Sequence, residues 1–421
     1  MPIALLGAMT DATPTVYRDR DFYAFVSGRF LATVAMQVQS VAIGWQIYAL
    51  THSTFALGLV GLCQFGPMFL LTLPAGDMSD RFDQRKILSL TQAMQGACGA
   101  LFLVLSLLNP HSVWPYFAIL ILFGCARGFY GPSSQSLLPF LVPPEKLPKS
   151  IAMSSSVFTT AVIAGPALGG FLYALGPAAT YSVCIVCFAG AAICSASLGG
   201  RYRPAHVDTG ASRLERVAEG VRFVRHRPVV LGAISLDLFA VLLGGATALL
   251  PVYARDILHA GPIGLGVLRS GPAVGAALMA FSLARWPIQR HTGIIMFAAV
   301  AIFGAATIVF GVSHSFYISL IALAVLGASD MISVFVRSAL IQYATPDEMR
   351  GRVSAVSMLF IGASNELGEF ESGITAGWFG TIPAVVLGGL GTLAVVGAWM
   401  ALFPPLRKID RLADAANSPV R

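Results

Sequence analysis

The chain has 421 residues, of which 56% are hydrophobic and only 11% are charged, and its formal net charge is +7. Soluble proteins carry roughly 25% charged residues, so this composition excludes an ordinary soluble protein. The positive charge alone could indicate a nucleic-acid binder, but the positions of the basic residues argue against that class.

Long stretches without Asp, Glu, Lys or Arg recur along the whole chain, the first at Phe30–Gly76 and the second at Ile87–Ala126. A spanning helix needs about 20 mostly apolar residues, so each stretch is long enough for two spans. The apolar runs lack the period-2 alternation that a membrane β-barrel requires. The sequence therefore predicts an all-α membrane protein with twelve transmembrane helices, at 22–50, 54–76, 86–108, 114–140, 150–174, 179–200, 228–253, 263–285, 293–312, 315–341, 352–378 and 382–404.

The basic residues gather on one side of the predicted membrane. Of the 27 Lys and Arg, 22 lie in the two terminal segments and in alternate loops, whereas the opposite loops hold essentially one, Arg255. This is the positive-inside bias of membrane proteins, and it predicts an inner-membrane protein with both termini cytoplasmic. Residues 1–21 show no removable signal, because the apolar segment Met1–Met9 is short and lacks a basic region. Membrane lipids, and not nucleic acid, are the expected surroundings.

The chain divides into two halves of six helices. Gly66-Pro67 matches Gly271-Pro272 at an offset of 205 residues, as expected of parallel repeats about an axis normal to the membrane. The predicted segments are a cytoplasmic arm 1–21, a helix bundle 22–200, a linker 201–227, a helix bundle 228–404 and a cytoplasmic tail 405–421. The linker is expected to form an amphipathic surface helix, with a regulatory partner helix as the alternative. Its apolar face comprises Leu214, Val217, Ala218, Val221 and Val224.

The charged cluster at residues 76–86 carries the first resemblance to a known family. Its spacing of Gly76, Asp80, Arg81 and Arg85 resembles the loop between helices 2 and 3 of the major facilitator superfamily of secondary transporters, although Asp83 stands where that motif has a second glycine. The resemblance implies two pseudo-symmetric six-helix bundles, and it implies that these four residues form a latch for one conformation. The alternative is that the basic residues only keep the loop in the cytoplasm.

Other segments resemble one branch of that superfamily. Residues 127–131 are similar to its second motif, and residues 164–170 are similar to a motif associated with antiporters. Residues 137–145 and 347–353 resemble the branch of enterobactin exporters and drug:proton antiporters, also named transmembrane secretion effectors. The resemblance implies alternating access and proton-coupled efflux of an amphipathic organic compound that is siderophore- or drug-like. Proton-symport uptake of a small solute, or a transport-inactive sensor or accessory protein, are the alternatives.

Two Gly-Pro-x-x-Gly segments occupy spans 5 and 8, which face each other in the superfamily architecture. Small residues four apart let helices approach closely, and proline bends a helix. The prediction is a seam on which the halves rock, with ordinary helix packing as the alternative. Its residues are Gly165, Pro166 and Gly169 in the first half, and Gly271, Pro272 and Gly275 in the second.

Ionisable residues inside predicted spans are the candidate transport residues, because an unpaired charge at membrane depth costs several kcal/mol. Glu366 and Glu369 share one helical face, whereas Glu371 is turned away from it. A carboxylate in a low-dielectric surrounding can exchange protons near neutral pH, so these two acids are the predicted proton-coupling pair. Arg127 and Asp330 are their predicted charge partners, and Asp237 is a further candidate.

The alternative for all of these residues is a structural role, as carboxylates neutral or paired with arginine. Arg337 shares a face with Asp330, and Arg269 is interpreted as a residue that only extends its charge toward the membrane surface. Amides inside the spans, at Gln37, Gln39, Gln64 and Asn365, are candidates for lining a polar cavity.

Several other functions find no support in the sequence. A nucleotide-binding Gly-x-x-x-x-Gly-Lys-Ser/Thr segment is absent, as are His-Glu-x-x-His and clustered Cys/His sets. Cys184 and Cys187 are interpreted as small buried hydrophobic residues in a helix. We therefore expect no enzyme activity, no cofactor, no metal and no nucleotide, and a small-molecule substrate and protons as the partners.

Overall fold

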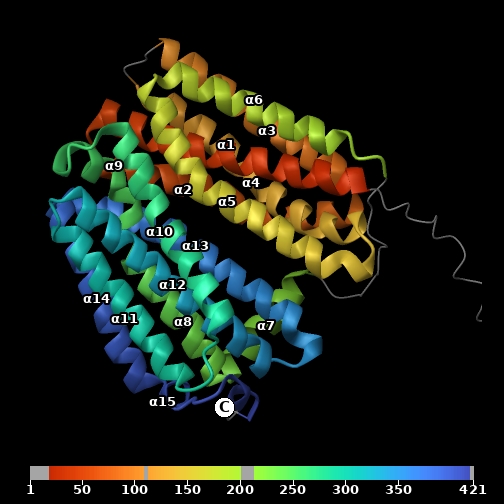
Figure 1. The fold of residues 1–421 in the computed structure, drawn as a ribbon, viewed down its shortest axis with the longest axis vertical. Coiled ribbons are helices and arrows are strands. Elements are labelled where there is room, and N and C mark those ends of the chain that lie inside the picture. Colours follow the sequence, from red (N-terminus) through yellow and green to blue (C-terminus); the bar gives the residue numbers. More distant parts are fainter. Residues whose placement is uncertain (1–18, 109–111, 201–212, 418–421) are drawn as a thin grey trace, which may run out of the picture.

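The computed structural model describes residues 19–108, 112–200 and 213–417, and in these residues every regular element is helical. Figure 1 shows two bundles lying side by side, one for each half of the chain. The first holds α1 (Asp19–Thr51), α2 (Thr54–Arg81), α3 (Gln84–Leu108), α4 (Trp114–Leu141), η1 (Pro144–Lys146), α5 (Leu147–Ala174) and α6 (Pro177–Ala196). The predicted arm and the start of the linker lie almost wholly outside the described residues.

The linker helix α7 (Arg213–His226) precedes the second bundle. That bundle holds α8 (Pro228–Leu243), η2 (Ala246–Leu249), α9 (Leu250–Val252), η3 (Tyr253–Ile257), α10 (Gly261–Arg285), α11 (Thr292–Val312), α12 (Phe316–Ala344), α13 (Asp347–Phe379), α14 (Thr381–Leu402), α15 (Pro404–Arg407) and η4 (Leu412–Asn417).

Ten helices in the described residues are long and apolar enough to cross a membrane. The remaining two predicted spans are α4 and α13, which have 28 and 33 residues. They are the helices that carry Arg127, Glu366 and Glu369, and these charges lower their hydropathy. The all-α membrane fold is thus confirmed. The two predicted spans that are long enough but less apolar, α4 and α13, carry three of the candidate transport residues.

The seventh predicted span, 228–253, is broken where a continuous helix was expected. α8 ends at Leu243, and Gly245 packs so closely on α13 that a Cβ there would lie 2.9 Å from the Ser372 hydroxyl. The Thr392 hydroxyl of α14 donates to the Ala240 carbonyl at 3.0 Å, at the end of α8. Irregular backbone inside a membrane protein is tolerated where it is buried in protein or lines a cavity, and both conditions hold here.

The loop between α2 and α3 is much shorter than predicted. α2 continues to Arg81 and α3 begins at Gln84, so only Phe82 and Asp83 lie between them. The Asp83 carboxylate accepts a hydrogen bond from the Arg85 backbone N–H at 3.1 Å and thereby caps the start of α3. This cap gives a physical reason for an aspartate at the position where the related motif has glycine.

The two bundles meet through α2 against α13 and through α5 against α10. Both contacts rest on small residues: Gly58 lies against Gly373, and Gly170 lies against Gly266. In lipid, helices associate by close packing and not by the hydrophobic effect, so glycine pairs are an effective way to join the halves.

A buried cluster continues this contact at the end where α1 stops. It combines Tyr48 and Leu57 of the first half with Tyr253 and Leu265 of the second. The Tyr48 hydroxyl also donates to the Asp256 carboxylate across the two halves. The halves are therefore joined firmly at the end of the molecule that lies away from α7 (Figure 1).

The predicted seam glycines make different contacts from those expected. Gly165 and Gly169 of α5 pack against Gln37 and Val38 of α1, and Gly275 of α10 packs against Ala324 of α12. These glycines therefore face helices of their own halves, and Gly271 likewise faces α12. The contact between α5 and α10 lies further along, where Gly170 and the Pro166 carbonyl meet Gly266.

The linker helix α7 is anchored to the second half. The Glu219 carboxylate accepts an ion pair from Arg352 of α13 at 2.8 Å, and Val224 is buried in the core of that half. A Cβ on Gly220 would lie 2.8 Å from the Arg352 carbonyl oxygen, so glycine permits this close approach. Part of the predicted apolar face thus packs on the bundle.

The glycine contact between α5 and α10 leads to the first prediction. In Gly266→Ala the new Cβ would lie 2.5 Å from the Pro166 carbonyl oxygen, whereas in Gly66→Ala it would meet no atom within 4 Å. We expect Gly266→Ala to destabilise the detergent-purified protein by about 1–3 kcal/mol, measured as a lower unfolding temperature. Gly66→Ala should leave that temperature unchanged or raise it slightly. Equal unfolding temperatures for the two variants would contradict this packing.

Candidate functional site

A polar cavity of about 260 Å³ lies between the two halves. Helices α1, α2, α4 and α5 of the first half line it together with α10 and α13 of the second. Its lining residues are Thr33, Met36, Gln37, Ser40, Gln64, Phe123, Arg127, Phe158, Val162, Arg269, Glu366 and Glu369. The cavity therefore gathers charged, amide and aromatic side chains at the contact that would have to change if the halves moved.

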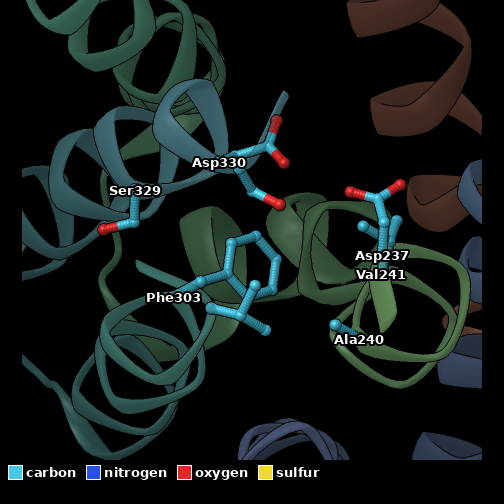
Figure 2. A pocket seen from close by; sticks show the side chains of 8 residues that line it. Asp237, Ala240, Val241, Phe303, Ser329 and Asp330 are labelled. Atoms are coloured by element: carbon cyan, nitrogen blue, oxygen red, sulfur yellow. The ribbon is translucent and has the colours of Figure 1, made fainter. Parts of the chain in front are cut away.

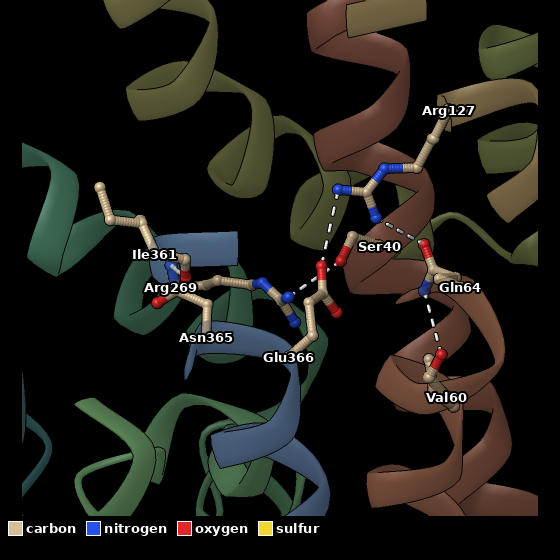
Figure 3. Close-up of polar contacts among 8 residues, drawn as sticks. All are labelled: Ser40, Val60, Gln64, Arg127, Arg269, Ile361, Asn365 and Glu366. Atoms are coloured by element: carbon tan, nitrogen blue, oxygen red, sulfur yellow. Dashed lines mark hydrogen bonds and ion pairs between the residues drawn. The ribbon is translucent and has the colours of Figure 1, made fainter. Parts of the chain in front are cut away.

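Arg127 is held in this cavity from the side of α4. Its guanidinium donates to Gln64 Oε1 at 3.1 Å, and Gln64 in turn donates to the Val60 carbonyl at 3.4 Å (Figure 3). One turn earlier, Gly124 brings α4 against the backbone of Gln64. A glycine thus sets the helix spacing, and the spacing places the arginine beside its amide partner.

Glu366 and Glu369 both line this cavity, as their spacing along one helical face predicts. Glu366 Oε1 lies 3.7 Å from the Arg127 guanidinium, which makes an ion pair between the halves. Glu369 packs beside Gly61 of α2, where a Cβ would lie 3.2 Å from its carboxylate oxygen. Among the described residues, Glu369 makes no hydrogen bond or ion pair.

Arg269 points into the cavity and not toward the membrane surface, so its interpretation from sequence as a snorkelling residue is wrong. Its guanidinium donates to Ser40 Oγ of α1 at 2.9 Å and thereby crosses from the second half to the first. Figure 3 shows the side chain close to Glu366, and the two groups interact electrostatically. Two guanidinium groups, one from each half, therefore approach the same carboxylate.

A second cavity, of about 230 Å³, lies inside the C-terminal half. It is lined from α8, α10, α11, α12 and α13, and its charged residues are Asp237, Asp330, Arg337 and Glu369. Glu369 also lines the first cavity, so one acid borders both. The open backbone at Gly244 and Gly245 forms part of the wall, which explains why the broken helix is tolerated there.

Arg337 and Asp237 form a buried ion pair in this second cavity. The exposed fractions of the two residues are only 2% and 5%. Asp330 reaches the same space from α12 (Figure 2), but in the described part of the chain it makes no hydrogen bond or ion pair. The predicted partnership of Asp330 with the Glu366–Glu369 pair is thus limited to sharing one cavity with Glu369.

The described latch residues make contacts within the first half. Arg85 donates to the Leu198 carbonyl beyond the end of α6 at 2.6 Å, where a cation complements the helix dipole. Ser79 of the same segment lies 3.3 Å from Ser136 of α4. Gly76 is buried in α2, and the side chains of Asp80 and Arg81 lie outside the described part of the structure.

Other candidate residues lie apart from the cavities or at their walls. Glu371 accepts a hydrogen bond from Thr375 at 2.6 Å and lines neither cavity, in agreement with its predicted orientation. Asn365 lines the second cavity, whereas Gln39 is fully buried in the first half. Cys184 is a buried free thiol, and the described residues contain no cluster of three His, Cys, Asp or Glu that could hold a metal.

Sequence reasoning missed three parts of the site. Ser40 is an ordinary serine in an apolar span, and no local signal marks it as the partner of Arg269. Gly61 was not singled out, although it lies three residues from Gly58 on the face that meets α13. The pair Gly244-Gly245 just before Pro251 was the signal that could have predicted the broken helix.

The family model of the transmembrane secretion effectors matches residues 16–420 of the chain. The chain is also similar to the enterobactin exporter EntS of Shigella boydii serotype 18, with 26% identity over 380 residues that cover 88% of this chain and 85% of that protein.

Two solved structures share the fold. A bacterial homolog of the human lysosomal transporter Spinster, in an inward-facing and occupied conformation, has a TM-score of 0.69 and 15% identity, covering 93% of this chain and 96% of that one. A peptide transporter POT in complex with sulfate has a TM-score of 0.72 and 12% identity, covering 93% and 96%.

The buried pair of Asp237 and Arg337 allows a prediction about stability. Asp237→Asn or Arg337→Gln alone leaves one buried charge without its partner and should cost about 3–5 kcal/mol. The double variant leaves no unpaired charge and should unfold at a higher temperature than either single variant in detergent. If the two losses simply added in the double variant, the two side chains would not be acting as a pair.

Proposed function

Because the chain belongs to the transmembrane secretion effector family of the major facilitator superfamily, we propose that it is a proton-coupled exporter of an amphipathic organic compound. The protein is a multi-pass membrane transporter and not an enzyme. The observation that carries the proposal is the cavity between the halves, where Glu366 and Glu369 face Arg127 and Arg269.

Alternating access is supported by the uneven contact between the halves. They are joined at the end that holds Tyr48 and Asp256. Toward the other end, α5 exposes Ser155 and Thr159 on the face that continues to Val162 in the cavity wall. Polar side chains at membrane depth are favoured next to water, so this face is proposed to line an aqueous entrance. The positive-inside bias assigns that entrance, and both termini, to the cytoplasm.

Proton coupling is proposed at Glu366 and Glu369. The charged groups that face Glu366 are Arg127, Arg269 and the second acid Glu369, and Glu369 borders both cavities without a described ion pair. A carboxylate surrounded by protein is far more stable at this depth when it is either protonated or paired with a cation. Protons would thus be carried inward on these acids and exchanged for substrate in the cavity that faces the cytoplasm.

The proposed substrate class follows from the lining and from the relatives. Phe123, Phe158 and Met36 provide apolar surface, and Gln37 and Gln64 provide amides for orientation, as expected for a site that binds an organic molecule. The similar proteins are named enterobactin exporters, so siderophore-like compounds are the first candidates and drug-like compounds the second. Direction from the cytoplasm outward follows from the same similarity.

Replacing the two acids tests the proposed coupling. Glu366→Gln and Glu369→Gln mimic the protonated carboxyl at nearly constant volume. We expect each variant to insert normally and retain substrate binding but to lose the pH dependence of transport. In the double variant, accumulation driven by a pH gradient in proteoliposomes should fall to the level of protein-free vesicles. A panel of siderophores and cationic drugs provides the test substrates.

Glu371→Gln is the matched control, because Glu371 lies on the same helix but is bonded to Thr375 outside the cavities. It should transport at the wild-type rate. Gradient-driven export at the wild-type rate by the Glu366→Gln, Glu369→Gln double variant would assign these acids a structural role. Accumulation in the direction of the proton gradient would instead support uptake by symport.

We further propose that Gly76, Asp80, Arg81 and Arg85 act as a latch when the halves close at the cytoplasmic end. Asp80→Asn should slow transport several-fold without affecting insertion, since it removes a charge at nearly constant side-chain volume. Vesicle transport rates measure the effect, with Glu145→Gln as the control because Glu145 is an exposed acid in another loop on that side. Normal turnover of Asp80→Asn would leave this segment only its role in topology.

A further inference from the structure

The C-terminal cavity contains more negative than positive charge. Of its four ionisable side chains, three are acids and one is a base, because Asp237, Asp330 and Glu369 share the space with Arg337 alone. Arg337 is already committed to its ion pair with Asp237. The groups that face Asp330 are thus an ion pair of no net charge and a second acid, while α10 and α11 contribute Pro272 and Phe303, which do not ionise.

This arrangement leaves the negative charge of the Asp330 carboxylate without a positive charge to balance it. Asp330 is partly buried, and an ionised carboxylate without a partner at membrane depth is costly, so such a group favours a proton or a bound cation. No described side chain supplies that positive charge to Asp330. A small ion that can enter the cavity would supply this charge.

A void beside Asp330 has the size and the ligands for such an ion. It measures about 10 Å³, roughly the space of one water molecule, and its polar lining residues are Asp237, Ser329, Asp330 and Ser333. Ser333 is only 3% exposed, and its hydroxyl has no hydrogen-bond partner in the described structure. By contrast, Ser329 donates to the Val325 carbonyl at 2.8 Å and is directed away from Asp330 (Figure 2).

We propose that Asp330 and Ser333, beside Asp237, form a binding site for a monovalent cation, either a proton or Na⁺, inside the C-terminal half. Carboxylate and hydroxyl oxygens suit hard cations. Asp237 is neutralised by Arg337, and Glu369 does not line the void, so Asp330 supplies one net negative charge there, which matches a monovalent cation. The site is separate from the cavity between the halves, and Glu369 is the one ionisable residue that borders both.

The proposal that this ion drives export rests on the proposed function. The proposal that the ion binds at Asp330 does not rest on it. With Asp330 occupied, Glu369 faces a neutral site. With Asp330 empty and ionised, Glu369 faces a second negative charge. Occupancy of the inner site would thus be sensed by an acid in the wall of the substrate cavity.

Binding can be tested on the purified full-length protein in detergent, without a substrate. The unfolding temperature is measured in NaCl, KCl and choline chloride at equal ionic strength, at pH 5.5 and at pH 8. The variants are Asp330→Asn and Ser333→Ala, with Glu371→Gln as the matched control. Asp330→Asn removes a charge and leaves the shape unchanged, so it is expected to fold.

If the ion is Na⁺, NaCl should raise the unfolding temperature of the wild-type protein at pH 8 above its value in choline chloride. Asp330→Asn should abolish this rise, and Ser333→Ala should increase the half-maximal Na⁺ concentration at least about tenfold, which corresponds to the loss of about 1.4 kcal/mol.

If the ion is a proton, the salts should act alike. The wild-type protein should then lose stability relative to Asp330→Asn as the pH rises from 5.5 to 8, because the wild-type carboxyl gives up its proton in a buried site. The proposal is overturned if neither Na⁺ nor pH separates the wild-type protein from Asp330→Asn. Failure of export with an intact cation response would count against the proposed function alone.

Discussion

The structure depends on how buried charges are neutralised. A bundle in lipid cannot hold an isolated charge at membrane depth without a cost of several kcal/mol, so each ionisable group needs a partner or a wet cavity. Here one ion pair joins the two halves and another lies inside the C-terminal half. Arg127 pairs with Glu366 between the halves, whereas Asp237 pairs with Arg337 within one half. The first kind of pair would have to change if the halves separated, and the second kind could persist.

Helix α13 combines the packing and the charge in one element. Its Gly373 lets it contact α2 closely, and Glu366 and Glu369 precede this glycine on the same side of the helix. At its start, Arg352 pairs with Glu219 of the linker helix. A displacement of α13 would therefore alter three contacts at once. These are the packing between the halves, the lining of both cavities and the contact with the linker helix α7. That linkage makes α13 the natural element through which charge state and conformation affect each other.

Much of the fold could be predicted from the sequence because lipid imposes simple rules on it. The twelve spans, the two halves and the position of Glu366 and Glu369 on one face follow from apolar length and helical period. The partners of the charges could not be predicted, since they depend on helix rotation and on which helices meet. Arg269 is the clearest example, because only the contact of α10 with α1 brings it to Ser40.

The glycine motifs also show that the sequence does not identify which helices are in contact. Small residues at helical spacing predict close packing correctly, but they do not identify the neighbour, and Gly165 and Gly271 each face a helix of their own half. The break at Gly244 was missed because a hydropathy count treats the span as continuous, although irregular backbone there is acceptable only beside a cavity. Local sequence therefore determines what each residue can do, and the packing of the halves determines with which partner it does it.

The division of the charged residues between two cavities is itself informative about coupling. If substrate and ion bound in one space, each would have to displace the other directly. Here the acids of the inner cavity are separated from the cavity between the halves by the wall that holds Glu369. The proposed coupling would need only one carboxylate that responds electrostatically to charges in both cavities, and a group in low dielectric responds strongly to a nearby charge. The position of Glu369, beside Gly61 and without a described ion-pair partner, leaves it free to make that response.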